Sequence, residues 1–99
     1  MDNTTVRKLN ISCNNFNTRD YEIASRIGRL IQVHIQLSHL DISCCKLTQA
    51  ELIFIVICLR ESKCLSAIHM GQNNVDYYGR LMLRHVLKAR VKYPFRASI

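Results

Sequence analysis

Apolar residues recur at relative positions 1, 4, 6 and 11 in three stretches of the chain, with polar residues between them. The clearest stretch runs from Leu37 to Leu47, and the other two begin at Val6 and Leu65. The residues that hold the four positions are Val6, Leu9, Ile11 and Phe16, then Leu37, Leu40, Ile42 and Leu47, then Leu65, Ile68, Met70 and Val75. A pattern that recurs at a fixed spacing predicts stacked copies of one structural unit.

Each copy begins with a strand pattern and continues with a helix pattern. Residues 6–11 alternate with the period of two that is typical of a strand with one buried face. Apolar residues over 21–31 then recur at intervals of three and four, which predicts a helix capped by Asn17 or Thr18. The starts of the copies lie 31 and then 28 residues apart, enough for a strand, a turn and a helix of about three turns.

Two further helices are predicted by their capping residues. Thr48 and Glu51 stand three residues apart in the spacing of a capping box, directly before an apolar run. Asp76 is the expected cap of a third helix that runs through Leu87. The second helix is apolar on every face over 52–59, so either the neighbouring helices cover both of its flanks or a partner does.

Position 9 of the three stretches is occupied by Asn14, Cys45 and Asn73, where an amide can bond backbone groups that a turn leaves unpaired. The pattern LxxLxLxx(N/C)xL followed by a helix resembles the leucine-rich repeat, and specifically its long-repeat, ribonuclease-inhibitor-like class, over residues 6–90. Gly79 stands where that class often has glycine, whereas the first copy departs with Asp20. The resemblance implies an α/β fold, a right-handed solenoid of about three repeats with short parallel strands inside and helices outside.

We therefore expect a flexible N-terminus over 1–5, a leucine-rich-repeat domain over 6–92 and a tail over 93–99. The repeats cover about 6–36, 37–64 and 65–92. Because Tyr93-Pro94 ends the regular pattern, the strand at 65–70 is predicted to be an open sheet edge. Such an edge is a pairing liability that a neighbouring chain could cover, which predicts a subunit or fragment of a larger assembly.

Equivalent positions of neighbouring parallel strands lie side by side, so the inner surface can be predicted as columns of residues. The columns are small and polar, and the resemblance implies that such a surface binds other proteins. The predicted protein-binding residues are Lys8, Asn10, Ser12, His39, Asp41, Ser43, Cys44, His69 and Gln72.

Residues of this surface also include those used in two other kinds of site. Asp41 beside His69, with Ser43 or Cys44 as nucleophile, would suggest hydrolysis, but parallel side chains on a flat sheet offer no pocket and no oxyanion donors. Zinc would need four converging ligands, and the available cysteines and histidines lack paired ligand spacing. We therefore predict no enzyme activity, no metal and no cofactor.

The 14 basic and 7 acidic residues give a formal net charge of +7, and the excess lies near the C-terminus. Residues 77–99 contain six basic side chains and no acidic one. This basic patch is an alternative binding site, for nucleic acid or an anionic membrane. A stripe of charge is more usually a solvated outer helix face, and an acidic protein surface is a third explanation. The patch consists of Arg80, Arg84, Lys88, Arg90 and Lys92.

The cysteine content and the lengths of the apolar runs also indicate where in the cell the protein is located. The five cysteines are odd in number and lack CxxC spacing, which favours reduced thiols over a disulfide framework. The N-terminus has no signal-peptide pattern, and the longest apolar run is far shorter than a bilayer span. We predict a cytoplasmic scaffold subunit that binds other proteins, with a cytoskeletal or ciliary complex as one setting, and no transmembrane segment.

Overall fold

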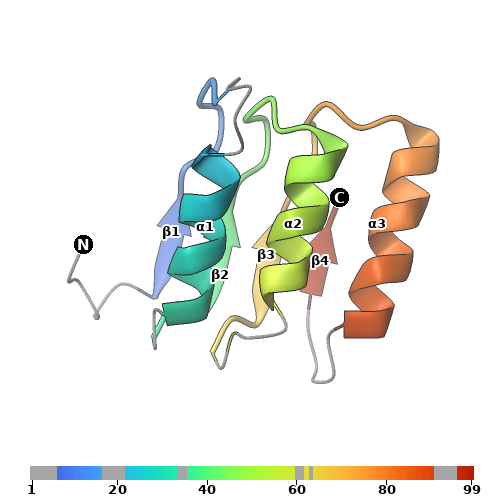
Figure 1. The fold of residues 1–99 in the computed structure, drawn as a ribbon. Helices are drawn as coiled ribbons and strands as arrows, with labels where there is room; N and C mark the ends of the chain where they lie inside the picture. The colour runs from blue at the N-terminus through green and yellow to red at the C-terminus, as the bar shows by residue number, and fades with distance from the viewer. Residues whose placement is uncertain (1–6, 17–21, 34–35, 60–61, 63, 91–95) are drawn as a thin grey trace.

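The structure is a computed structural model that describes residues 7–16, 22–33, 36–59, 62, 64–90 and 96–99. The described residues form an α/β fold of two layers, in which a four-stranded sheet is covered on one face by three helices (Figure 1). Strands and helices alternate along the chain. Their order is β1 (Lys8–Asn10), α1 (Glu22–Val33), β2 (His39–Asp41), α2 (Gln49–Leu59), β3 (Ala67–His69), α3 (Tyr77–Arg90) and β4 (Arg96–Ser98).

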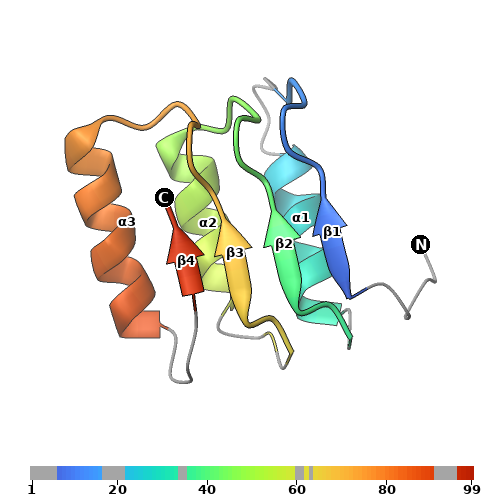
Figure 2. The same ribbon diagram turned by 180° about the vertical axis from the view of Figure 1, so that it is seen from behind.

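All neighbouring strands are parallel, and their spatial order follows the chain order. The predicted α/β class is therefore confirmed, as is the predicted register. Leu9, Leu40 and Ile68 occupy paired positions of β1, β2 and β3, and their neighbours pair in the same register. Figure 2 looks onto the sheet face on which none of the described helices lies.

The tail predicted over 93–99 is wrong for Arg96–Ser98, because these residues form β4. The predicted open edge at β3 is wrong for the same reason, since β3 pairs with β4 along its length. Arg96 N donates to Ser66 O at 2.9 Å, and Met70 N donates to Ser98 O at 2.7 Å. The backbone groups that β3 presents therefore find partners within this chain, and among the described residues β1 and β4 are the two edges of the sheet. Residues 93–95 of the predicted tail lie outside the described part.

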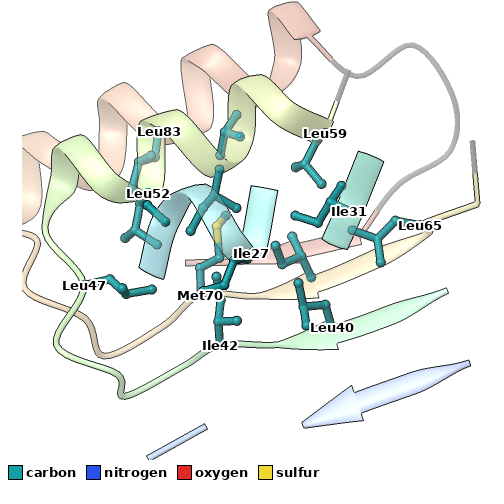
Figure 3. Packing of buried hydrophobic residues seen from close by; sticks show 14 of the residues in the cluster. Ile27, Ile31, Leu40, Ile42, Leu47, Leu52, Leu59, Leu65, Met70 and Leu83 are labelled. Carbon is teal, nitrogen blue, oxygen red and sulfur yellow. The ribbon is translucent and has the colours of Figure 1, made fainter. Parts of the chain in front are cut away.

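The hydrophobic core lies between the helices and the sheet (Figure 3). Ile42 and Leu40 of the central strand region have no exposed surface, and Leu52 and Leu59 of α2 belong to the same buried cluster. α2 packs between α1 and α3, so the first explanation of its apolar flanks is confirmed. Its outward residues Phe54 and Ile57 remain exposed. Within the described part of the chain, no helix combines the length and apolar character needed to cross a bilayer.

The capping box at the start of α2 is confirmed. Thr48 N donates to Glu51 Oε1 at 3.1 Å, and Glu51 N donates to Thr48 Oγ1 at 3.2 Å. At α3, Asp76 Oδ1 accepts a hydrogen bond from Gly79 N at 2.8 Å, which confirms Asp76 as the cap. These bonds satisfy amide groups that the first helical turn cannot satisfy itself. The predicted caps of α1, Asn17 and Thr18, lie outside the described residues.

Asn73, at position 9 of the third stretch, joins two neighbouring turns through its side-chain amide. Its Oδ1 accepts hydrogen bonds from Cys45 N at 2.9 Å and Leu47 N at 3.0 Å. Its Nδ2 donates to Ile42 O at 3.1 Å and to Met70 O at 2.9 Å. The amide thus satisfies donors and acceptors of a turn that packs over the core, as expected from its position.

The other two position 9 residues make simpler contacts. Asn14 Nδ2 donates to Ile11 O at 2.7 Å, and the buried Cys45 thiol lies 3.2 Å from the same carbonyl oxygen. Cys45 has no exposed surface, so it acts as a small buried residue that also bonds the turn.

Candidate functional site

The uncovered face of the sheet carries the side chains that were predicted to bind protein. Leu40 is buried beneath the helices, and because successive strand residues point to opposite faces, His39 and Asp41 project from the other side. None of the nine predicted residues is fully buried, and the structure brings them together along β1, β2 and β3 and the turns that follow. They are Lys8, Asn10, Ser12, His39, Asp41, Ser43, Cys44, His69 and Gln72.

Two neighbouring strands end in the same side-chain turn. Asp41 Oδ1 accepts hydrogen bonds from Ser43 N at 3.0 Å and Ser43 Oγ at 2.6 Å. In β1, Asn10 Oδ1 accepts from Ser12 N at 2.9 Å and Ser12 Oγ at 2.5 Å. The spacing of Asn or Asp two residues before Ser is a known turn signal that could have predicted this geometry. Its effect is to hold Asn10 and Asp41 in one fixed orientation.

The charge of Asp41 follows from these contacts. The Ser43 hydroxyl lowers the pKa of Asp41, with smaller contributions from the Ser43 amide and from the positive charge that His69 can carry, whereas partial burial opposes the shift. Asp41 is therefore ionised at neutral pH. Both of the bonds to Ser43 use Oδ1, and the other carboxylate oxygen, Oδ2, makes no hydrogen bond with the described residues. As far as the described residues go, this oxygen therefore keeps its capacity to accept a hydrogen bond.

Residues of β2, β3 and β4 and of the turns after them surround an open hollow of about 340 Å³ on this face. Within it, Ser98 Oγ lies 2.9 Å from His69 Nδ1. Gln72, in the turn after β3, has a left-handed backbone with a φ of 58°. The residues that line the hollow are Asp41, Ser43, His69, Gly71, Gln72 and Ser98.

Ser98 is a site residue that the sequence analysis missed. It lies in β4 beside His69, 29 residues further along the chain, a distance close to the spacing of the earlier stretches. That spacing could have predicted a further strand at Ser98, but these residues were predicted to be a tail. With Ser98 present, a row of four polar residues crosses the sheet at one register position, namely Asn10, Asp41, His69 and Ser98.

The row contains the residue types of a hydrolytic triad in a different arrangement. In such a triad the carboxylate orients the histidine, and the histidine activates the serine. Here the hydrogen bonds of Asp41 go to Ser43, while His69 faces Ser98. The row therefore contains a histidine–serine contact like that of a triad, while the carboxylate is bonded to a different serine. Among the described residues there is also no group of three or more metal-ligating side chains suited to hold an ion.

The basic patch is described only in part. Arg84 and Lys88 are exposed on α3, whereas Arg80 is half-buried and its Nη1 donates to Val75 O at 3.3 Å. Arg90 closes α3, but its side chain, like all of Lys92, lies outside the described part. The same helix exposes large apolar and aromatic side chains, which are Tyr77, Tyr78, Leu81 and Met82.

Comparison with known proteins does not assign the chain to a family. It matches no protein-family model, no curated protein sequence and no solved structure. The geometry of the sheet face and of α3 therefore carries the functional inference.

Proposed function

We propose that this protein is a non-catalytic interaction module that binds another protein through the open face of its sheet, as a scaffold subunit of a larger assembly. The observation that carries this proposal is the row of polar side chains at one register position, next to the hollow at β2, β3 and β4. Short side chains fixed by the turn bonds of Asn10 and Asp41 lose little freedom when a partner binds.

We also propose that the chain is a short leucine-rich-repeat solenoid. Three observations support this: the parallel strands pair at equivalent positions, the helices lie on one face, and Asn73 bridges two turns. Arg96, Ala97 and Ser98 pair with positions 3, 4 and 5 of the third stretch. In the proposed solenoid they therefore belong to the strand of a fourth unit.

The proposed partner presents a cationic or hydrogen-bond-donating group to Asp41. Among the described residues that line the hollow, Asp41 is the only acidic one, and its pKa is lowered, so it provides a negative charge at neutral pH. Gln72 and Ser98 add an amide and a hydroxyl beside it. A lysine or arginine side chain of a protein partner satisfies all of these groups together.

Asp41→Lys is expected to weaken partner binding at least tenfold, because it reverses the charge that the partner meets. The measurement is affinity capture with the full chain, identification of the captured protein, and titration of that protein against each variant. Asp41→Asn is the sharper variant, since Asn10 shows that asparagine makes the same bonds to a serine two residues later. Its binding loss would report the charge alone.

Glu22→Lys on the outer helix α1 changes the net charge by the same amount as Asp41→Lys and serves as the matched control. Circular dichroism spectra of all variants are expected to match that of the wild type. Equal partner affinity of the wild type and Asp41→Lys would contradict the proposal.

The alternative function is binding of nucleic acid or an anionic membrane through α3. Arg84 and Lys88 are exposed there, residues 77–99 contain no acidic side chain, and Tyr77 and Tyr78 are available for stacking on bases. A phosphate-rich partner would then bind the outer layer, on the side of the molecule opposite the polar row.

If this alternative holds, the double variant Arg84→Glu and Lys88→Glu abolishes binding to a single-stranded oligonucleotide or to anionic vesicles. Wild-type affinity would fall steeply with salt, because each neutralised phosphate releases counterions. Arg26→Glu with Arg29→Glu on α1 makes the same charge change on another exposed helix. Binding that is absent in the wild type, or lost equally in both double variants, would remove this alternative.

A further inference from the structure

Cys13 and Cys44 lie opposite each other just beyond the ends of β1 and β2. The register pairs Asn10 with Asp41, and each cysteine follows its strand residue by three positions. The backbone ladder continues into this region, since Cys13 N donates to Ser43 O at 3.0 Å. Neighbouring strands are about 4.8 Å apart, which lies inside the range of about 4.4–6.8 Å between the Cα atoms of disulfide-bonded cysteines.

The two cysteines also share a backbone conformation. Both are left-handed, with φ values of 60° for Cys13 and 54° for Cys44, so they occupy equivalent places in equivalent turns. The two thiols are close enough to influence each other, since the interaction with Cys13 contributes most to raising the pKa of Cys44. Cys13 is exposed and Cys44 is partly exposed, so a reagent in solution can reach the pair.

We propose that Cys13 and Cys44 form a reversible disulfide bond with each other when they react with a disulfide oxidant such as oxidised glutathione. This bond joins the turn after β1 to the turn after β2. This function is separate from partner binding by the polar row. The site is a dithiol, and its substrate class is a small disulfide.

The reaction is two thiol–disulfide exchanges. The Cys13 thiolate attacks one sulfur of oxidised glutathione, the glutathione S–S bond breaks, and one glutathione leaves while a mixed disulfide forms at Cys13. The Cys44 thiolate then attacks the Cys13 sulfur, and the second glutathione leaves. The two cysteines are oxidised, the oxidant is reduced to two glutathione thiols, and these take up the two protons.

The order of attack follows from exposure and bonding. Cys13 is the more exposed thiol and meets the oxidant first. The interaction with Cys13 is the main cause that raises the pKa of Cys44. The mixed disulfide removes the Cys13 thiol from that interaction, which frees Cys44 for the second attack.

Cys45, the nearest other cysteine, is a poor competitor. It has no exposed surface, its thiol bonds Ile11 O, and burial raises its pKa. Cys58 lies on α2, in the helix layer behind the sheet. Both their position in the fold and their accessibility therefore favour a disulfide between Cys13 and Cys44.

The test is oxidation of the purified full chain in buffers of increasing oxidised-to-reduced glutathione ratio, followed by alkylation, trypsin digestion and mass spectrometry. The expected product is a monomer lighter by two hydrogens, with the peptide that contains Cys13 linked to the peptide that contains Cys44 and Cys45. Because trypsin leaves the last two together, fragmentation between them assigns the link to Cys44. Cys13→Ser and Cys44→Ser are expected to abolish it, and Cys64→Ser to retain it.

Thermal unfolding gives a second readout. The oxidised wild type is expected to unfold at least about 5 °C above the reduced wild type, because the bond closes a loop that contains α1. Cys13→Ser should show no such difference. The proposal would be overturned by a link to Cys45 or by a disulfide-linked dimer. It would also be overturned if every cysteine of the folded chain remained a free thiol, and so became alkylated, at the highest glutathione ratio.

Discussion

Ile42→Asp is expected to leave the chain unfolded at 25 °C. Ile42 has no exposed surface and lies in the core directly after the central strand β2, where Figure 3 shows it beside Met70. A carboxylate placed there has to be buried without a partner or protonated, and either outcome costs several kcal/mol in addition to the lost apolar contact. A domain of this size is stable by only about 5–15 kcal/mol. Far-UV circular dichroism and urea titration measure the outcome.

Two variants serve as controls for this prediction. Ile42→Val removes one methylene group from the same site and should cost about 1 kcal/mol with a cooperative unfolding transition retained. Cys45→Asn places an amide at a position where Asn14 and Asn73 already bond the turns, so its expected effect is within about 1 kcal/mol. A wild-type spectrum and melting curve for Ile42→Asp would contradict the description of this core.

Asn73→Ala is expected to destabilise the protein by about 3 kcal/mol, the second largest effect. The substitution removes the hydrogen bonds of one amide, which accepts from two backbone N–H groups and donates to three backbone carbonyls, the longest of these bonds being 3.5 Å to Gly71 O. Cys45 N and Leu47 N then lie in a turn with no side-chain acceptor, and an unsatisfied buried group costs about 1–3 kcal/mol. Urea unfolding should show a lower midpoint with an unchanged slope.

Asn74→Ala is the matched control, because it removes the neighbouring asparagine. Asn74 is exposed, and its side chain makes one bond, from Nδ2 to Lys46 O at 3.2 Å. Its expected cost is about 0.5–1 kcal/mol. Equal effects of the two substitutions would show that the bridging role assigned to Asn73 is wrong.

Much of the sheet could be predicted from residue spacing. The apolar residues at positions 4 and 6 define which side of each strand is buried, and a shift of one residue would expose them. For that reason Lys8, His39 and Ala67 pair as predicted, and so do Asn10, Asp41 and His69. The capping box at Thr48 was equally predictable, because its bonds are local.

β4 could not be predicted in the same way. The residue of β4 that pairs with the buried Ile68 is Ala97, whose small side chain gives little apolar signal for a strand. In addition, Pro94 indicated an end to regular structure. What forms this strand is backbone pairing with β3, a contact between segments distant in sequence. The hollow was missed for the same reason, since Ser98 completes it.

The left-handed turns after the strands have a conformational cost. Cys13, Cys44 and Gln72 each adopt a positive φ that glycine adopts without strain and other residues adopt at a cost of about 1 kcal/mol. Glycine in any of the three places would relieve that strain and would also remove a side chain from the rim of the sheet. The rim of the sheet is therefore a place where gaining stability and keeping side chains oppose each other.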